Sequence, residues 1–323
     1  MTTVPAATTP LPVQRDAERS QAVAAIVMVL ALVVAPFVLY PIFLMKALCF
    51  ALFACAFNLL IGYVGLVSFG HALYFGWASY LAAYAAKSWG LPPELAILTG
   101  TAAALGLGVV AGVIAIRRQG IYFAMITLAL AQMMYLVALR AKLTGGEDGI
   151  QAVPRGRLFG LFDLGNQMTM YVFVLVVVLA AFFLVYRIIN SPFGEVLKAI
   201  RENEQRAISL GYNTDRYKLV AFVLSATLAG LAGSMKALVF QLASLTDVHW
   251  TMSGEVLLMT LVGGLGTVFG PVVGAFFIVA MENYLAPFGQ WVLVIQGCVF
   301  VFCVLAFRRG LVGELAHVLK VRL

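Results

Sequence analysis

The sequence predicts an all-α, polytopic integral membrane protein with about eight to ten transmembrane helices, some of them broken by glycine or re-entrant. The first observation is composition: the 323 residues are 63% hydrophobic and only 11% charged, which a soluble domain of this size could not accommodate. The second is length, because the apolar runs reach the roughly 17–25 residues that a transmembrane helix needs. The third is a net charge of +7, which fits basic loops held on the cytoplasmic side.

Residues 1–22 are expected to form a disordered cytoplasmic N-terminus, because the first residues are rich in Thr, Pro and Ala. The apolar run that begins at Val23 is too long for a signal-peptide core, so it is interpreted as an uncleaved first span. Residues 23–310 form the predicted transmembrane domain, and residues 311–323 a cytoplasmic tail. The predicted spans are residues 23–43, 47–66, 69–86, 94–116, 121–139, 169–186, 219–239, two within 254–287, and 291–307.

Basic residues indicate one orientation. They lie before the first span, between the fourth and fifth, in a charged loop at residues 187–218, and after the last span. With a cytoplasmic N-terminus and ten crossings, all four basic groups fall in the cytoplasm. The turn-rich loop at residues 140–168 then falls outside. Eight crossings plus a re-entrant pair would keep the same sidedness.

Two glycine-rich breaks interrupt the apolar runs. They contain Gly62, Gly65, Gly70 and His71, and then Gly263, Gly264 and Gly266. Such segments in corresponding halves of a chain indicate a translocation path built from internal repeats. The alternative is that they are tight turns or close-packed helix crossings. Asn58 and His71 flank the first break, where either could contact a solute or satisfy broken backbone.

Five polar side chains lie within or at the ends of the predicted spans: His71, Gln132, Lys236, Glu255 and Glu282. Ionisable groups inside a membrane cost roughly 2.5–3.5 kcal/mol at a helix centre, so each is a functional hypothesis. Lys236, Glu255 and Glu282 are expected near the outer ends of their helices. A long side chain there can reach water, which weakens the case that these three line a path.

The charged loop is predicted to be helical. It carries six basic and four acidic residues between Arg187 and Lys218. Ser191 followed by Pro192 is typical of a helix start, and the residues after them follow an amphipathic pattern. A second short helix is expected from about Glu204, ending at Gly211, which suits a left-handed C-terminal residue. A helical, charged loop between spans indicates a docking surface for a partner.

The second short helix carries the first resemblance. Gln205-Arg206-Ala207-x-x-x-Gly211 is similar to the Glu-Ala-Ala-x-x-x-Gly motif of bacterial ABC-importer permeases, although only Ala207 and Gly211 match. Longer motifs, in matching order over about residues 46–310, resemble the permeases of branched-chain amino acid uptake systems. These motifs are Asn58-Leu-Leu-x-Gly-Tyr-x-Gly-Leu-x-Ser-x-Gly-His-Ala, Gly120-Ile-Tyr-Phe-Ala, Leu143-Thr-Gly-Gly-x-Asp-Gly-Ile, Lys198-Ala-Ile-Arg-Glu-Asn-Glu, Arg216-Tyr-Lys-Leu-x-Ala-Phe and Gly263-Gly-Leu-Gly-Thr. The Thr-Gly-Gly-x-Asp-Gly and Tyr-Phe-Ala motifs favour the M-type of the two permeases.

The resemblance implies a multi-pass permease subunit of an ABC importer in the bacterial cytoplasmic (inner) membrane, and the basic groups indicate that both termini are cytoplasmic. Such a subunit pairs with a second, related permease, sits on two cytoplasmic ATPase subunits and receives solute from an extracytoplasmic binding protein. Its coupling helix would comprise Glu204, Gln205, Arg206, Ala207 and Gly211. Ala207 and Gly211 carry over as packing and turn residues, whereas Gln205 and Arg206 depart from the motif. The implied solutes are branched-chain amino acids, with urea, amides or small organic acids as the alternative.

Several function classes are disfavoured. The chain lacks a Gly-x-x-x-x-Gly-Lys-Ser/Thr motif, so ATP hydrolysis is expected in separate subunits. No catalytic constellation, metal-ligand cluster or cofactor motif is present, so an enzyme is not expected. The bases are spread over loops, which disfavours nucleic-acid binding. An ion-coupled secondary transporter is the competing hypothesis; it should show charged sites at mid-membrane, whereas the charged loop favours ATPase partners.

Overall fold

A computed structural model of the chain describes residues 12–289, 291–307 and 310–318. Ten helices form the apolar body: α1 (Pro12–Val34), α2 (Pro41–Ile61), α3 (His71–Lys87), α4 (Pro93–Ala115), α5 (Ile121–Arg140), α6 (Gln167–Ile189), α9 (Thr214–Phe240), α10 (Trp250–Gly263), α11 (Gly270–Leu285) and α12 (Trp291–Ala306). Two short helices, α7 (Pro192–Glu202) and α8 (Glu204–Ser209), follow α6, and α13 (Gly310–Val318) follows α12.

Short elements connect these helices. Four single-turn 3₁₀ helices are described: η1 (Ala35–Phe37), η2 (Gly146–Asp148), η3 (Leu245–Asp247) and η4 (Ala286–Phe288). Strand β1 (Ile150–Gln151) pairs antiparallel with β4 (Leu242–Ala243), and β2 (Arg157–Leu158) pairs with β3 (Phe162–Asp163). The loop between α5 and α6 is therefore tied by β1 to the chain just after α9.

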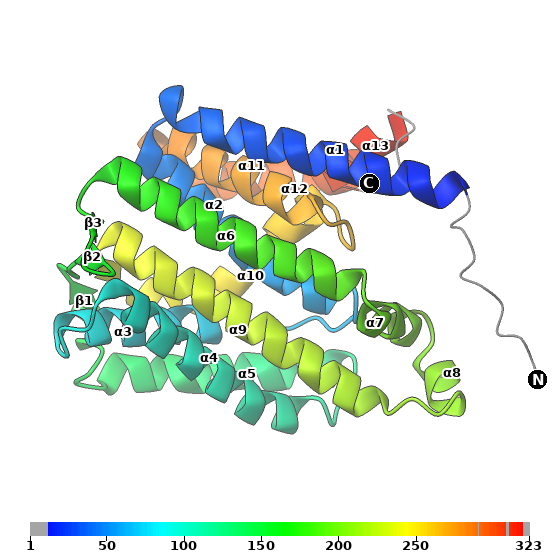
Figure 1. Ribbon diagram of the computed structural model, residues 1–323. Helices are drawn as coiled ribbons and strands as arrows, with labels where there is room; N and C mark the ends of the chain where they lie inside the picture. Colours follow the sequence, from blue (N-terminus) through cyan, green and yellow to red (C-terminus); the bar gives the residue numbers. More distant parts are fainter. Residues whose placement is uncertain (1–11, 290, 308–309, 319–323) are drawn as a thin grey trace, which may run out of the picture.

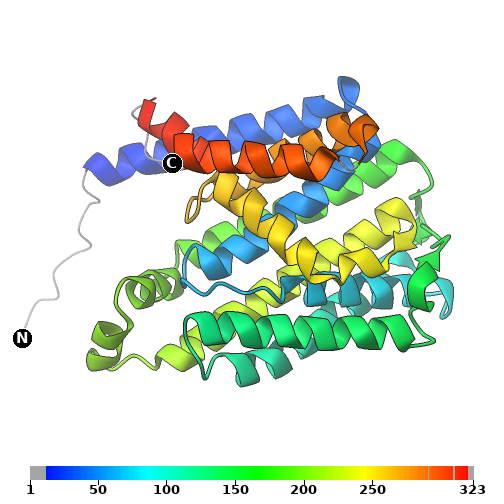
Figure 2. The ribbon, with the colours of Figure 1, turned by 180° about the vertical axis from the view of Figure 1, so that it is seen from behind.

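The long helices lie side by side in the body of the molecule (Figures 1 and 2). α1, α11 and α12 lie on one side, α4 and α5 on the other, and α2 and α9 between them. Burial agrees, because 94% of the most apolar window of α2 is buried, against 28% for α5 and 33% for α4. α2 is thus the central helix of the core. The outward apolar faces, with side chains such as Val110, Ile121 and Phe183 exposed, suit lipid or another apolar partner.

The two ends of the body differ (Figure 1). α7 and α8 extend from one end, where the start of α1 and α13 also lie, and the small strands lie at the other. We call these the α8 end and the hairpin end. The α4–α5 turn lies at the α8 end too (Figures 1 and 2). The α4–α5 turn with Arg117 and Arg118 and the charged loop at residues 187–218 thus share the α8 end, whereas Lys87, Arg140, Lys142, Arg155 and Arg157 lie at the hairpin end.

The predicted all-α class is confirmed. Within the described residues, six helices are long and apolar enough to cross a membrane, and two shorter apolar helices accompany them. The long segment at residues 254–287 forms two helices, α10 and α11, that meet near Gly263, as predicted. α10 has 14 residues, about 21 Å at the rise of an α-helix, which is shorter than the roughly 30 Å hydrocarbon core. The expected broken segments are therefore present.

Three boundary predictions were wrong. The first span was placed at residues 23–43, but α1 begins at Pro12 and ends at Val34. The second was placed at residues 47–66, but α2 begins at Pro41 and ends at Ile61. Residues 12–22 are helical, so the predicted disorder of residues 1–22 fails there, and residues 1–11 lie outside the described residues. The helix extends because the polar stretch before Val23 is rich in Gln, Arg, Glu and Ala, which are good helix formers. It ends early because Pro36 lacks a backbone donor and Pro41 starts α2 at its first position.

Candidate functional site

The two glycine breaks meet at the α8 end. Asn58, in the last turn of α2, donates its Nδ2 proton to Thr267 O at 2.9 Å and accepts at Oδ1 from Gly266 N at 3.0 Å. Its side chain is buried, so it satisfies backbone groups that the break between α10 and α11 leaves free. Of the two roles predicted for Asn58, this geometry favours satisfying the broken backbone.

Arg201 of α7 joins the same junction. Its Nη1 donates to Gly62 O, the carbonyl just after α2. Its side chain also covers two glycines with left-handed backbone: Gly65 (φ 81°), where a Cβ would lie 3.2 Å from Arg201 Cγ, and Gly266 (φ 73°), where it would lie 3.0 Å from Nη1. We call this cluster of Asn58, Gly62, Gly65, Arg201 and Gly266 the junction. Sequence reasoning did not single out Arg201 as a site residue; its place in the Lys-Ala-Ile-Arg-Glu motif was the available signal.

The second break is a close-packed hairpin. A Cβ on Gly263 would lie 1.9 Å from Gly270 O, and one on Gly274 would lie 1.9 Å from Met259 O. Only glycine permits α10 and α11 to approach this closely. Gly264 ends α10 with φ 126°, a conformation that other residues rarely adopt. The predicted path residues Gly263 and Gly264 therefore occupy a tight turn and crossing, which is the alternative that the sequence left open.

The first break leaves the junction as an extended segment that runs back between the helices to α3 (Figure 2). Neighbouring helices satisfy its backbone: Phe69 N donates to Thr127 Oγ1 of α5 at 3.2 Å, and Ala72 N donates to Ser253 Oγ of α10 at 2.8 Å. A Cβ on Gly70 would lie 2.6 Å from Thr127 O. Gly70 and His71 are thus placed away from the other path residues, at the inner end of α3.

His71 is fully buried. Its Nε2 lies 2.8 Å from Ser225 Oγ, and the Ser225 hydroxyl donates to Ala56 O. Because the serine proton is used on Ala56, Nε2 must carry the proton that joins His71 to Ser225. Nδ1 is then an acceptor, and it has no partner among the described residues. With the edges of Phe57 and Tyr74 around the ring, His71 braces α2, α3 and α9.

The predicted coupling residues divide into internal and exposed ones. Glu204 pairs with Lys218 and accepts from Thr214 Oγ1 at 3.2 Å, which ties α8 to the start of α9. Ala207 is 2% exposed, and Gly211 has φ 90° with open space around it. Gln205 and Arg206 are exposed.

The helix before α8 is firmly seated. Ser191 Oγ accepts from Gly194 N at 3.4 Å, which caps α7 as predicted, and Leu197 and Ile200 are buried. Phe193 stacks on Tyr217 of α9, with ring centroids 5.6 Å apart. Asn203 caps α8, because its Oδ1 accepts from Arg206 N at 3.0 Å. Beyond it, the side chains of Ile208 and Leu210 are exposed and apolar. α7 is thus fixed to the body while α8 presents a free face.

Comparison with known proteins identifies the family. Residues 39–304 match a family model described as branched-chain amino acid transport system / permease component. The chain is 25% identical over 288 residues to the high-affinity branched-chain amino acid transport system permease protein LivM of Escherichia coli K12, covering 82% of this chain and 68% of that one. No solved structure matches the chain.

Two further relatives cover less. One is the probable branched-chain amino acid transport permease protein LivH of Methanocaldococcus jannaschii, 28% identical over 42% of this chain and 44% of its own. The other is the autoinducer 2 import system permease protein LsrC of Photorhabdus laumondii, 31% identical over 29% of this chain and 30% of its own. Because the family model spans most of the sequence, the chain belongs to the permease components of branched-chain amino acid transport systems, and within that family it is LivM-like.

Proposed function

We propose that this chain is one of two permease subunits of an ABC importer that carries branched-chain, aliphatic amino acids through the membrane. The observation that best supports this proposal is the junction. It connects α7 to both glycine breaks, and α7 is followed directly by the exposed helix α8. A displacement of α8 would reach Gly62 through α7 and Arg201, and Gly266 through Asn58. A permease driven from outside its own chain requires such a connection.

The partners follow from this assignment. Two ATPase subunits would dock on the α8 end, which is cytoplasmic in our proposal together with both termini. A solute-binding protein would dock on the hairpin end, outside the bacterial inner membrane. A second, related permease would complete the path against an outward apolar face. The chain itself would hydrolyse nothing and would need no cofactor.

We propose two roles for the predicted path residues. Five glycines at the α8 end would close the path there in this conformation, and the hydrogen bonds of the junction would hold it closed. They are Gly62, Gly65, Gly263, Gly264 and Gly266. Gly70 and His71 would hold the inner end of α3 in place. These residues are packed against one another, so a solute would pass only after the junction opens.

Two classes of solute are candidates for the proposed importer. The names of the LivM relatives support branched-chain amino acids, whereas the LsrC relative is an importer permease for autoinducer 2, a different solute. Urea, amides and small organic acids remain the second candidate. The apolar core suits an aliphatic side chain.

The test is uptake by vesicles that hold both permeases, both ATPases and the binding protein. We expect saturable, ATP-dependent uptake of labelled leucine, isoleucine or valine, and no ATP hydrolysis by this chain alone. Urea uptake without leucine uptake would reject the amino-acid assignment but keep the importer. Uptake driven by an ion gradient without ATP would reject the importer in favour of a secondary transporter.

A further inference from the structure

Four helices each carry an ionisable residue at the same depth below the hairpin end. Lys46 and Glu255 are the sixth residues of α2 and α10. Lys236 is the fifth residue counted back from the last residue of α9, and Glu282 is the fourth counted back from the last residue of α11. Asp247 of η3 lies beside them. We call these five residues the charge layer. Sequence analysis flagged three of them separately; the fold places all five together, on elements up to 236 residues apart.

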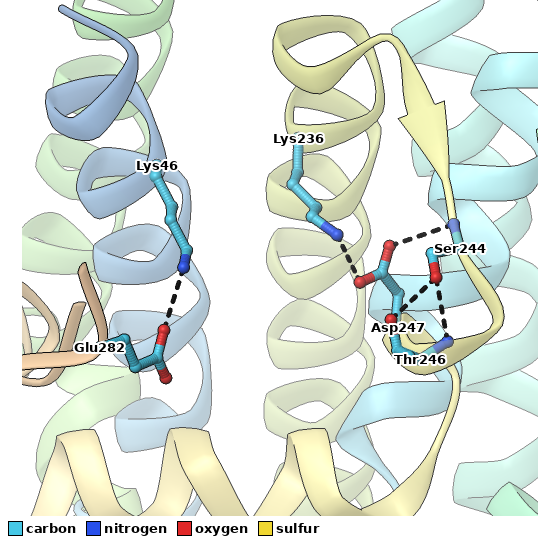
Figure 3. A network of polar contacts seen from close by, with 6 residues as sticks. All are labelled: Lys46, Lys236, Ser244, Thr246, Asp247 and Glu282. Carbon is cyan, nitrogen blue, oxygen red and sulfur yellow. Dashed lines mark hydrogen bonds and ion pairs between the residues drawn. The ribbon is translucent and has the colours of Figure 1, made fainter. Parts of the chain in front are cut away.

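Four members of the layer are already paired (Figure 3). Lys46 Nζ lies 3.0 Å from Glu282 Oε2, and Lys236 pairs with Asp247. Asp247 is only 1% exposed, and it also accepts from Ser244 N at 3.5 Å. Its pair with Lys236 is therefore enclosed and fixed. The Lys46–Glu282 pair is more open, with side chains 31% and 21% exposed.

Glu255 is the member without a partner. Its carboxylate makes no hydrogen bond or ion pair with any residue that the structure describes, although the charges of Lys46, Lys236, Asp247 and Glu282 all act on it. The layer holds two lysines for three acids, so Glu255 has no lysine of its own. Glu255 is partly exposed, and nothing lies within 4 Å of the position a Cβ would take on neighbouring Gly254. The open space therefore begins beside the unpaired acid.

Such a group does not belong against lipid. A carboxylate facing the hydrocarbon is costly, and charged side chains in spans therefore face a water-filled cavity or a partner group. A solute group that pairs with Glu255 would be cationic and small enough to reach the space beside Gly254. The ammonium of a zwitterionic solute meets both requirements.

We infer that Glu255 lines the solute path near the hairpin end and binds the ammonium group of a zwitterionic amino acid as it enters. This inference rests on the proposed function, since it requires that the chain forms part of an aqueous path. It adds a specificity element within the permease itself. The Lys236–Asp247 pair fixes the neighbouring helices and takes no part in binding.

The first arm tests whether Glu255 faces water. In the full complex lacking native cysteines, Glu255→Cys should react with a membrane-impermeant thiosulfonate, in the nucleotide-free or the vanadate-trapped state. The matched control is Leu98→Cys, because Leu98 is also the sixth residue of a helix, α4, and is 61% exposed on an outward apolar face. We expect it to stay unreactive. A reactive Leu98→Cys beside an unreactive Glu255→Cys, or no reaction at either position in either state, overturns the inference.

The second arm tests the ammonium contact. Glu255→Gln keeps the size but removes the charge, and losing a charge-assisted contact corresponds to roughly a tenfold or greater effect. We expect leucine uptake to fall by about that factor while ATP hydrolysis stimulated by the loaded binding protein is kept. Glu255→Asp should restore part of the uptake. Unchanged uptake by Glu255→Gln overturns the inference.

The two arms separate this inference from the proposed function. If the wild-type complex takes up urea and not leucine, the amino-acid solute is wrong and the ammonium subsite falls with it. The cysteine arm then still reports whether Glu255 lines an aqueous path. If the complex takes up leucine and Glu255→Gln is normal, the importer stands and only the subsite fails.

Discussion

At the scale of single residues, Arg201 belongs to a local sequence motif but makes its hydrogen bond to a distant part of the chain. Its motif placed it only among the charges of the loop, yet its guanidinium meets a carbonyl 139 residues earlier in the chain. Asn58 reaches across 208 residues to Gly266 in the same way. Glycine breaks could be predicted from the sequence because glycine interrupts apolar periodicity locally. Their meeting could not, because no local pattern specifies which distant carbonyl a side chain will satisfy.

The hydrogen bond from Arg201 to Gly62 O can be tested by substitution. Arg201→Ala leaves Gly62 O without its donor, and the loss of a charge-assisted bond predicts roughly a tenfold or greater fall in solute moved per ATP hydrolysed. Arg201→Lys should recover only part, because lysine lacks the planar guanidinium that reaches both glycines. The measurement is leucine uptake and ATP hydrolysis on the same vesicles.

A matched control keeps the Arg201 result interpretable. Lys198→Ala removes the same charge from the same helix, α7, where the Lys198 ammonium pairs with Glu195 at 2.8 Å. Both variants should assemble with the other subunits. A normal transport-to-hydrolysis ratio in Arg201→Ala would remove the junction from the coupling route.

At the scale of elements, the helices of the charged loop were predicted well and the first two spans were not. The loop carried explicit local signals: Ser191 and Pro192 begin α7, Asn203 caps α8, and Gly211 takes φ 90°. The first spans form one apolar stretch in which hydropathy hardly changes across Pro36 and Pro41. Backbone chemistry sets the boundary there, so a hydropathy pattern alone placed it too late.

We predict that α8 couples ATP hydrolysis in the ATPase subunits to transport. Ala207→Trp together with Gly211→Trp puts bulk at a buried position and a side chain at a left-handed one. We expect transport to be lost while the chain stays in the membrane, because the altered α8 no longer fits its groove on the ATPase. Uptake and co-purification of the ATPases are the measurements. Glu195→Trp, on the exposed face of α7 (side chain 69% exposed), should leave both unchanged; normal uptake by the double variant would mean that α8 is not the coupling helix.

At the scale of the whole molecule, burial and charge indicate the same arrangement. The central helix α2 contributes a residue to each of the two clusters. Lys46 lies in the charge layer near the hairpin end, and Asn58 lies in the junction at the α8 end. A path closed at the junction and charged at the other end would be asymmetric along its length. This asymmetry is what a one-way importer requires, provided that the α8 end is cytoplasmic.

That orientation is the last prediction, and two exposed positions test it. Leu161, in the turn between β2 and β3, is 80% exposed, and the Glu195 side chain on α7 is 69% exposed; neither residue caps a helix. In a background without the native cysteines, Leu161→Cys should be labelled by an impermeant thiol reagent on intact spheroplasts, and Glu195→Cys only after permeabilisation. The reason is that basic loops stay in the cytoplasm, and the α8 end holds Arg117, Arg118 and the charged loop at residues 187–218, with its six basic residues. Labelling of Glu195→Cys but not Leu161→Cys in intact spheroplasts would invert the molecule and place α8 where no ATPase could reach it.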